Sequence, residues 1–258
     1  MSENWNSVNP DEIKRLIVQR FNDKVRGREP DTTGSHVNHD GKGGHWLEAQ
    51  MGIKHNANNA PDFPGYEMKN DTTSKTTFGD WSAHYYIFKD PQYRINRDRF
   101  MEIFGQYNAE KKRYSWSGIP IPKINVYNQF GQVLDVDATG NICAVYSYAQ
   151  DRRTDKSTIV PVAMQREDLV IARWGAEWMR NKVENKFNKA GWFKCKRDCS
   201  GVYDKIVFGG PINYSSWLDG VRKGLIYFDS GMFQGNARNY SQWRADNRYW
   251  ESLVTETY

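Results

Sequence analysis

The sequence predicts a mixed α/β (α+β) fold, and three observations support this class. A helix signal opens the chain, because Asn9 can cap the turn that Pro10 begins and apolar residues follow at helical spacing. Residues 119–149 then alternate in the manner of short β-strands. Residues 168–196 read as a long helix followed by a strand, so helices and strands are interspersed along the chain.

The elements before residue 116 are predicted as a helix, a loop and a hairpin. The first helix ends near Gly27, and the polar, glycine-rich loop over 27–44 is long enough to suggest a functional segment. A short helix around Glu48 ends near Gly52, and Pro64-Gly65 predicts the turn of a hairpin over 62–69. Residues 82–89 have the aromatic and β-branched content of a strand, and residues 98–107 have the apolar spacing of a helix.

The later elements begin with a β-rich stretch, whose strand candidates are 123–127, 133–136 and 141–148. Residues 168–187 are expected to form the longest helix, since Val170, Trp174 and Trp178 step by four, and 191–196 the strand after it. Residues 217–229 read as helix, turn and strand. Residues 235–244 read as a loop rich in Arg, Asn and Gln.

Composition restricts the class of protein. The 258 residues can form one large domain or two lobes, and 38% hydrophobic and 14% aromatic residues indicate a globular rather than a disordered chain. No apolar run approaches the roughly 18 residues that a membrane span needs, and the first residues lack the pattern of a signal peptide. Three cysteines, Cys143, Cys195 and Cys199, fit a reducing compartment rather than a disulfide framework. We therefore expect a cytoplasmic protein without membrane association and interpret the cysteines as structural.

The charge of the chain permits nucleic-acid binding without requiring it. The formal net charge is +5, from 36 basic and 31 acidic residues. Residues 180–197 carry seven basic residues against one acidic residue, which predicts either a contact with a nucleic-acid backbone or a solvated helix face. The seven are Arg180, Lys182, Lys186, Lys189, Lys194, Lys196 and Arg197. His36, His39 and His45 could bind a transition metal, although three polar loop residues are the more ordinary interpretation.

The segment with the clearest chemical content is Asp62 to Lys69. Glu67 and Lys69 are two residues apart, so on a strand they share one face, and the Pro64-Gly65 turn can bring Asp62 back towards them. Two carboxylates supply the hard oxygen ligands that Mg²⁺ prefers, and a lysine can hold a phosphate oxygen or orient a water. Charged groups this close are expected to hold one another in the charged form. The pattern is that of a metal-dependent nuclease, although a surface hairpin can carry it by chance.

A wider pattern includes this segment. It runs G-x-x-L-E-x-x-x-G-I from Gly44 to Ile53, continues through a spacer with Asn56, Asn58 and Asn59, and ends as P-D-F-P-G-x-E-x-K from Pro61 to Lys69. The run resembles that of the MvaI/BcnI-type restriction endonucleases, relatives of the mismatch-repair nicking enzyme MutH within the PD-(D/E)xK nucleases. Glu48 matches the helix glutamate of that family.

The resemblance implies a restriction-endonuclease-like core of helix, three strands, helix and strand. By role the chain would divide into a catalytic lobe (1–115) with the motif hairpin, a β-rich insertion (116–165), a helix and strand that complete the core (166–200), and a C-terminal DNA-recognition lobe (201–258). The implied activity is Mg²⁺-dependent hydrolysis of duplex DNA at a short, G·C-rich, near-palindromic site. A monomer with one active site is implied, and a cognate DNA methyltransferase is the expected functional partner.

The site residues follow from the same resemblance. Asp62, Glu67 and Lys69 are the expected catalytic residues, with Glu48 binding a second metal or positioning the water or the lysine. The expected metal ligands are Asp62, Glu67 and the Met68 carbonyl.

Contacts with DNA are expected from two sets of residues. Lys42, Lys75 and the 180–197 basic residues would contact phosphates. The base-reading candidates are Arg238, Asn239, Gln242 and Arg244. Tyr240 and Ser241 stand where the family has His and Gly, which leaves the base preference open.

Three other interpretations compete with a type II restriction endonuclease. A MutH-like strand-nicking repair enzyme would keep the chemistry but need a mismatch-repair partner. A catalytically weak DNA-binding protein with a nuclease fold is disfavoured because Asp62, Glu67 and Lys69 are all present. A structural or protein-interaction domain is disfavoured by the joint presence of the Glu48 helix, the hairpin and the late arginine loop.

Overall fold

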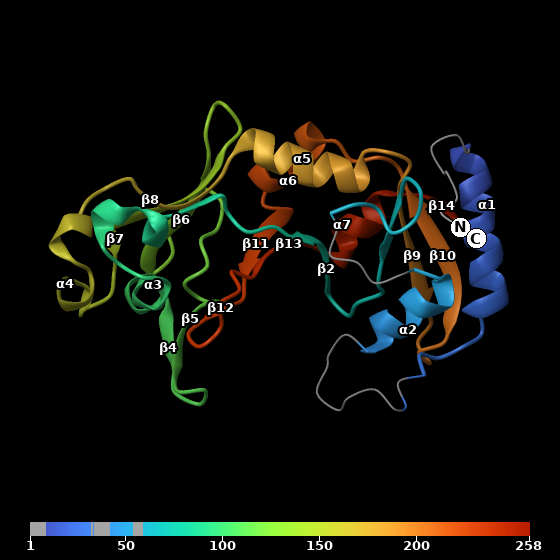
Figure 1. The fold of residues 1–258 in the computed structure, drawn as a ribbon, viewed down its shortest axis with the longest axis horizontal. Helices are drawn as coiled ribbons and strands as arrows, with labels where there is room; N and C mark the ends of the chain where they lie inside the picture. Colours follow the sequence, from blue (N-terminus) through green and yellow to red (C-terminus); the bar gives the residue numbers. More distant parts are fainter. Residues whose placement is uncertain (1–8, 32, 34–41, 54–58) are drawn as a thin grey trace. The chain divides into compact units, whose positions relative to one another are not determined.

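The computed structural model describes residues 9–31, 33, 42–53 and 59–258 (Figure 1). The described chain folds into two compact units. Unit 1 comprises Met1–Thr76, Lys182–Asn213 and Asp246–Tyr258, and unit 2 comprises Thr77–Asn181 and Tyr214–Ala245. The predicted mixed α/β class is confirmed. The functional division at residues 115, 165 and 200 is a division by role and stays a prediction beside these packing units.

Helix α1 (Pro10–Lys24) begins where the sequence predicts. The Asn9 side chain accepts a hydrogen bond of 3.0 Å from the Asp11 amide, and Pro10 occupies a position that needs no amide donor. Ile13, Ile17 and Phe21 form its buried face. This apolar stripe is the surface with which α1 packs on the sheet of unit 1.

The sheet of unit 1 has the strand order β1-β9-β10-β14. Its strands are β1 (Tyr66–Lys69), β9 (Gly191–Arg197), β10 (Tyr203–Gly209) and β14 (Val254–Thr257). β1 and β9 are parallel, whereas the β9–β10 and β10–β14 pairs are antiparallel. A parallel pair needs a long crossover, and helix α5 (Ala176–Phe187) leads into β9. The pairing therefore places the end of α5 and the start of β9 near the Asp62–Lys69 segment.

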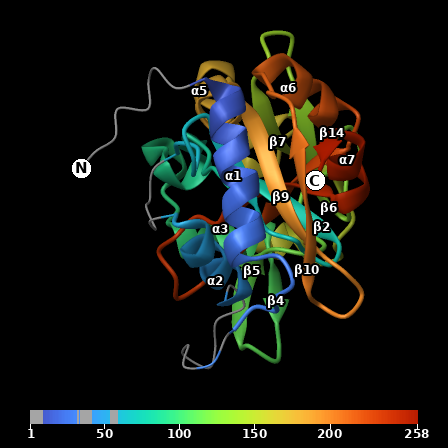
Figure 2. The same ribbon diagram turned by 90° about the vertical axis from the view of Figure 1, so that its right-hand side faces the viewer.

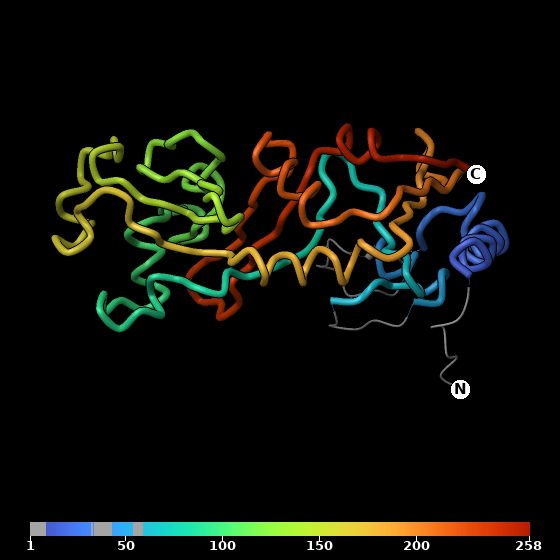
Figure 3. The backbone as a smooth tube through the Cα atoms, turned by 90° about the horizontal axis from the view of Figure 1, so that it is seen from above, coloured from blue at the N-terminus to red at the C-terminus, as the bar shows by residue number. Residues whose placement is uncertain are grey.

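One face of this sheet is covered by α1 and by α2 (Lys42–Met51). Figures 2 and 3 show α1 along the strands, from the side and nearly end-on. Tyr66 and Met68 of β1 belong to the hydrophobic core under these helices. Because side chains alternate across a strand, Glu67 and Lys69 lie on the opposite face.

The opposite face is partly covered by α7 (Asn247–Ser252). Its Trp250 packs edge-on against Trp192 of β9, with ring centroids 4.9 Å apart, and also contacts Phe187 at the end of α5. Trp192 and Trp250 are fully buried. Glu67 and Lys69, on this face of the sheet, are buried as well.

Unit 2 contains three small sheets of orders β3-β8-β7-β6, β11-β13-β2 and β12-β5-β4. Its helices are α3 (Arg97–Phe104), α4 (Lys156–Ile159) and α6 (Tyr214–Arg222). Its strands are β2 (Lys75–Asp80), β3 (Tyr85–Tyr86), β4 (Gln106–Asn108), β5 (Arg113–Trp116), β6 (Phe130–Val136), β7 (Ile142–Asp151), β8 (Leu169–Trp174), β11 (Ile226–Ser230), β12 (Met232–Phe233) and β13 (Ser241–Asp246). Trp174, Phe228 and Trp243 pack on one another in its core, with centroids 4.8–5.6 Å apart.

The prediction of one long helix over 168–187 is wrong. Residues 169–174 form strand β8, which pairs with β7, and only the part after Gly175 is helical, as α5. Val170 and Trp174 are four apart, a spacing that keeps two residues on one face of a strand as well as of a helix. The pattern was therefore ambiguous, and pairing with β7 decides it. The longest described helix is α1, with 15 residues.

Two strand predictions also differ from the structure. Of residues 82–89, only Tyr85–Tyr86 pair as strand β3, and Ile87–Lys89 form a 3₁₀ turn. Residues 123–127 form isolated bridges instead of a strand, since Ile124 alone meets Leu134 of β6. Both segments have the composition of strands but lack a neighbouring strand that could pair along their length.

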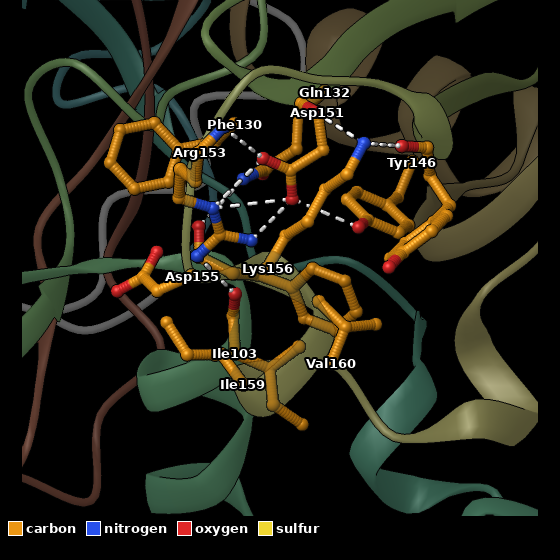
Figure 4. Close-up of polar contacts among 12 residues, drawn as sticks. Ile103, Phe130, Gln132, Tyr146, Asp151, Arg153, Asp155, Lys156, Ile159 and Val160 are labelled. Atoms are coloured by element: carbon orange, nitrogen blue, oxygen red, sulfur yellow. Dashed lines mark hydrogen bonds and ion pairs between the residues drawn. The ribbon is translucent and has the colours of Figure 1, made fainter.

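A buried polar cluster closes the end of β7 (Figure 4). Asp151, 2% exposed, accepts hydrogen bonds from the Nε and Nη2 atoms of the Arg153 guanidinium and from the Tyr146 hydroxyl. Arg153 also donates to the Ile103 carbonyl of α3, and Lys156 donates to the carbonyls of Tyr148 and Asp151. A buried charge is tolerated when it is paired and hydrogen-bonded in this way, so the cluster anchors the loop that follows β7.

None of the described helices combines the length and the apolar character that crossing a membrane requires.

Candidate functional site

A tight turn places Asp62 beside strand β1. The Phe63 amide donates to the Tyr66 carbonyl at 2.9 Å, and the Tyr66 amide donates back to Phe63 at 3.1 Å. Gly65 between them has φ of +83°, and a Cβ there would lie 3.1 Å from that of Ala190. Glycine fits because this backbone region is unfavourable for other residues. The reversal lets Asp62 Oδ2 accept the Met68 amide at 3.1 Å.

Glu67 and Lys69 are paired in a buried environment. Their relative exposures are 2% and 8%, and Lys69 Nζ donates to Glu67 Oε1 at 2.9 Å. The Lys69 ammonium also lies 5.0 Å from the centre of the Phe187 ring. The structure thus brings together Asp62, Glu67 and Lys69, the three residues that the motif singled out.

A fourth charged group enters this cluster from α5. Lys186 Nζ lies 3.0 Å from Glu67 Oε1, the oxygen that Lys69 also contacts. The sequence grouped Lys186 with the basic residues of 180–197 as a phosphate contact or a solvated cation. No local signal relates residue 186 to residue 67, because their proximity depends on the parallel pairing of β1 with β9.

Burial shifts the ionisation of the cluster. Loss of solvation, and secondarily the charge of Glu67, raises the pKa of Asp62 to about 6. Burial lowers the pKa of the Lys69 ammonium, although Glu67 acts in the opposite direction. The pKa shifts of Asp62 and Lys69 therefore run against the expectation that these groups favour one another's charged forms, because desolvation outweighs the attraction between the charges.

The donor atoms suit a hard divalent cation. Glu67 Oε2 is buried and has no hydrogen-bond partner among the described residues, so one carboxylate oxygen remains open. The Met68 amide faces Asp62, and since both main-chain groups of a strand residue point to one edge, its carbonyl lies on the Asp62 side of β1. The described residues contain no cluster of three or more Asp, Glu, His or Cys side chains that could hold a metal. Two carboxylates and a carbonyl match a cation such as Mg²⁺, which keeps several waters.

Glu48 lies in α2 between Leu47 and Met51, which are buried in the core of unit 1, and is itself half-buried. Its predicted role at the metal site stays a prediction. Asn59, in the spacer, donates its side-chain amide to the Lys182 carbonyl of α5 at 2.8 Å. Asn56, Asn58, His36 and His39 fall outside the described residues, and His45 is exposed on α2.

The basic residues of 180–197 do not form one solvated face. Lys194 is 1% exposed and donates to the Thr76 hydroxyl at 3.0 Å, and burial lowers the pKa of this lysine to about 8. Lys196 pairs with Glu251 at 2.6 Å. Lys75, a predicted phosphate contact, is half-buried at the start of β2. Lys42 begins α2, but its side chain falls outside the described part of the chain.

A second cluster lies in unit 2, in the loop between β12 and β13. Arg238 pairs with Asp80 at 2.7 Å and stacks 4.6 Å from the Tyr240 ring centre. The Asn239 side-chain oxygen accepts a hydrogen bond of 2.7 Å from Arg97 of α3. Arg97 also donates to the carbonyls of Phe233 and Arg238, so α3 ties down the loop. Sequence reasoning did not single out Arg97.

Gln242 and Arg244 share the partly exposed face of β13, while Trp243 between them is buried. Arg244 pairs with Asp229 of β11 at 3.3 Å and donates to the Gln242 side-chain oxygen. The Arg244 Nε atom is buried and lacks a hydrogen-bond partner within the described chain. This arginine is therefore held in place by an acidic neighbour and retains unused donor capacity.

The chain is similar to known restriction endonucleases in sequence and in fold. A family model described as LlaMI restriction endonuclease matches residues 25–258. The type II restriction enzyme ScrFI of Lactococcus lactis subsp. cremoris is 46% identical over 270 residues, which cover 96% of this chain and 99% of that protein. The structure of the restriction endonuclease MvaI–cognate DNA substrate complex resembles this fold with a TM-score of 0.56 and 14% identity, over 100% of this chain and 98% of that one.

Proposed function

Since this chain belongs to the LlaMI restriction endonuclease family and is a type II restriction endonuclease, we propose that it uses Mg²⁺ to cut double-stranded DNA at a short, G·C-rich, near-palindromic site. One observation supports this most directly. The buried Glu67 carboxylate lies beside Asp62 and Lys69, and its Oε2 atom has no hydrogen-bond partner among the described residues. Membership of this family favours a restriction endonuclease over a strand-nicking repair enzyme or a catalytically weak DNA-binding protein.

Each residue of the cluster has a distinct part in the proposed reaction. Asp62 and Glu67 would hold the cation through carboxylate oxygens, and Met68 would hold it through its carbonyl. A divalent cation held there would supply an activated water and would neutralise charge on the scissile phosphate. Lys69 orients the attacking water or donates to a phosphate oxygen. Glu48 positions this water or the lysine, or holds a second cation.

Enclosure of Lys69 supports its proposed role. The ammonium lies against the Phe187 ring and donates to Glu67, and a preoriented donor stabilises a transition state without reorganising first. Because burial lowers its pKa, Lys69 also releases a proton more readily than a solvated lysine. Both properties favour a group that acts on a water or a phosphate oxygen during the reaction.

Recognition is assigned to unit 2. Arg238, Asn239, Gln242 and Arg244 are the proposed base-reading residues, because Arg recognises guanine and Asn or Gln recognises adenine through paired hydrogen bonds. Lys42 and Lys75 are the proposed phosphate contacts, which orient the enzyme without reading sequence.

The chain carries one Asp62–Glu67–Lys69 set, so a monomer would cut the two strands in successive steps. We place this activity in the cytoplasm, beside a cognate methyltransferase that protects the host DNA.

The test is digestion of unmethylated phage DNA by the purified protein, with Mg²⁺ and with EDTA. Discrete fragments that depend on Mg²⁺ are expected, and mapping their ends gives the site and the stagger. Asp62→Ala should abolish them, and Lys69→Ala should slow cleavage by on the order of 100-fold or more. Asp204→Ala is the matched control, since Asp204 is an exposed acid of unit 1.

Two outcomes would contradict the proposal. Cleavage by Lys69→Ala at nearly the wild-type rate would exclude the proposed chemistry. Intact DNA under all metal conditions, with a folded protein, would exclude autonomous cleavage.

A further inference from the structure

Lys186 is the charged residue of the cluster that the motif does not include. It lies in the last turn of α5, where a cation is favoured by the helix dipole. That position alone would leave its ammonium in solvent. Instead the side chain is 18% exposed and its Nζ atom reaches Glu67, whose side chain is 3% exposed, at 3.0 Å.

The geometry at Glu67 is asymmetric. Lys69 at 2.9 Å and Lys186 at 3.0 Å both contact Oε1, whereas Oε2 has no hydrogen-bond partner among the described residues. One lysine comes from the same strand as Glu67 and the other from a separate helix. Two donors fixed to different elements hold the carboxylate in one orientation, and this orientation leaves the second oxygen open.

The Lys186 ammonium makes the number of positive groups in the cluster equal to the number of carboxylates. Asp62 and Glu67 supply two carboxylates, and Lys69 and Lys186 supply two ammonium groups. Without Lys186, the single remaining lysine would have to compensate Glu67 alone, and Lys69 would be held more firmly by this carboxylate. Lys69 could then no longer serve a water or a phosphate as freely.

We propose that Lys186 is a positioning residue of the active site, which orients the Glu67 carboxylate so that its open oxygen receives the divalent cation. This inference rests on the proposed function, because it assigns a role towards the same cation. Lys186 acts through Glu67 and is not itself a catalytic residue. Partners that orient a metal ligand typically change metal affinity or activity by about 10- to 100-fold when they are removed.

The direction in which metal affinity changes when Lys186 is removed distinguishes a lysine that orients Glu67 from one that acts only through its charge. A cation beside a metal site repels the metal, so a lysine that acted only through its charge would weaken metal binding, and its removal would strengthen it. A lysine that orients the ligand strengthens metal binding, and its removal weakens it. The two roles therefore predict opposite changes in the same dissociation constant.

The experiment measures Mn²⁺ binding to the full-length, DNA-free protein by calorimetry, with the thermal unfolding midpoint recorded to establish that each variant is folded. Lys186→Met removes the donor and the charge, Lys186→Gln keeps a donor without charge, and Lys186→Arg keeps both. Lys24→Met is the matched control, since Lys24 is an exposed lysine in the last turn of α1, in the same unit. Cleavage rates are then followed over a range of Mg²⁺ concentrations.

We expect Lys186→Met to weaken Mn²⁺ binding by about 10-fold or more and to raise the Mg²⁺ concentration for half-maximal cleavage by a similar factor. Lys186→Gln should weaken Mn²⁺ binding less, and Lys186→Arg and Lys24→Met should stay near wild type. Unchanged or tighter Mn²⁺ binding by both folded Met and Gln variants would overturn the inference.

A uniform loss of DNA affinity with normal Mn²⁺ binding would also overturn it, by making Lys186 a phosphate contact. A wild-type protein that fails to cut DNA would instead contradict the proposed function.

Discussion

Asp62 shows how burial at one residue changes the energetics of the site. Its pKa of about 6 lies above the ordinary value of 3.8 because desolvation outweighs the attraction of Lys69 and Lys186. The folded state therefore keeps a proton on Asp62 in a pH range in which the unfolded chain has released it. At neutral pH the buried Asp62 carboxylate therefore destabilises the metal-free folded state, and binding of a cation would offset this destabilisation.

This cost predicts a pH dependence of stability. Between about pH 4 and pH 6 the folded protein binds more protons at Asp62 than the unfolded chain does, so this contribution to the unfolding free energy decreases as the pH rises. A shift of about two pKa units corresponds to about 3 kcal/mol at most. The measurement is urea unfolding with EDTA at pH 4, 5, 6 and 7.

The Asp62 contribution is isolated by comparison with Asp62→Asn, which cannot titrate. The stability of wild type relative to this variant should fall over the window and level off above it. Asp204→Asn, at an exposed acid of the same unit, serves as the control. If the difference in unfolding free energy between wild type and Asp62→Asn did not change with pH, the Asp62 carboxyl would be solvated in the metal-free protein.

Helix α3 shows how one element positions another. Arg97 at its start donates to the Asn239 side chain and to the carbonyls of Phe233 and Arg238, and so connects α3 to the loop that enters β13. The proposed base-reading loop is therefore organised by a residue that is not proposed to read bases. A polar group whose partner is deleted typically costs about 1–3 kcal/mol when it stays buried.

Arg97→Ala is expected to loosen this loop and to lower cognate DNA affinity by about 10-fold, while affinity for a non-cognate duplex changes little. The expectation follows because phosphate contacts support non-cognate binding, whereas a fixed loop is needed to read bases. The measurement is a fluorescence-anisotropy titration in Ca²⁺ or EDTA, with both duplexes at one salt concentration. Arg99→Ala, on the same helix, is the control. Equal losses on both duplexes would instead place Arg97 among the phosphate contacts.

At the scale of the whole molecule, the two candidate clusters fall in different compact units. Asp62, Glu67, Lys69 and Lys186 belong to unit 1, and Arg238, Asn239, Gln242 and most of β13 belong to unit 2. Each unit has its own buried core, so a substitution in one cluster leaves the packing of the other intact. Chemistry and base recognition should accordingly be separable by mutation.

Asp62→Ala should abolish cleavage but keep the ratio of cognate to non-cognate affinity. Arg244→Ala should weaken cognate binding by about 1–3 kcal/mol and relax specificity, while residual cleavage keeps its Mg²⁺ dependence. Binding titrations and digestion of a substrate panel measure both properties for each variant. If Arg244→Ala weakened every duplex equally, Arg244 would belong to the phosphate contacts and the assignment of recognition to this strand would be wrong.

Some features of this protein were determined by the sequence itself. The start of α1 was predictable because Asn9 and Pro10 act on the adjacent turn. Asp62, Glu67 and Lys69 were predictable because a turn and the alternation of one strand bring them together within eight residues. The mixed α/β class also followed from local patterns. In each case the interactions involve near neighbours in the chain, whose geometry depends little on the rest of the molecule.

Tertiary structure alone decided the remaining features. Strand β8 looked helical until pairing with β7 selected one of the two periods that its spacing allows. Lys186 and Lys194 looked like surface cations until the parallel pairing of β1 and β9 turned both inward. The pKa of Asp62 rises because distant segments exclude solvent from it. These properties arise from burial and long-range pairing, which depend on which segments meet and not on the residues next in sequence.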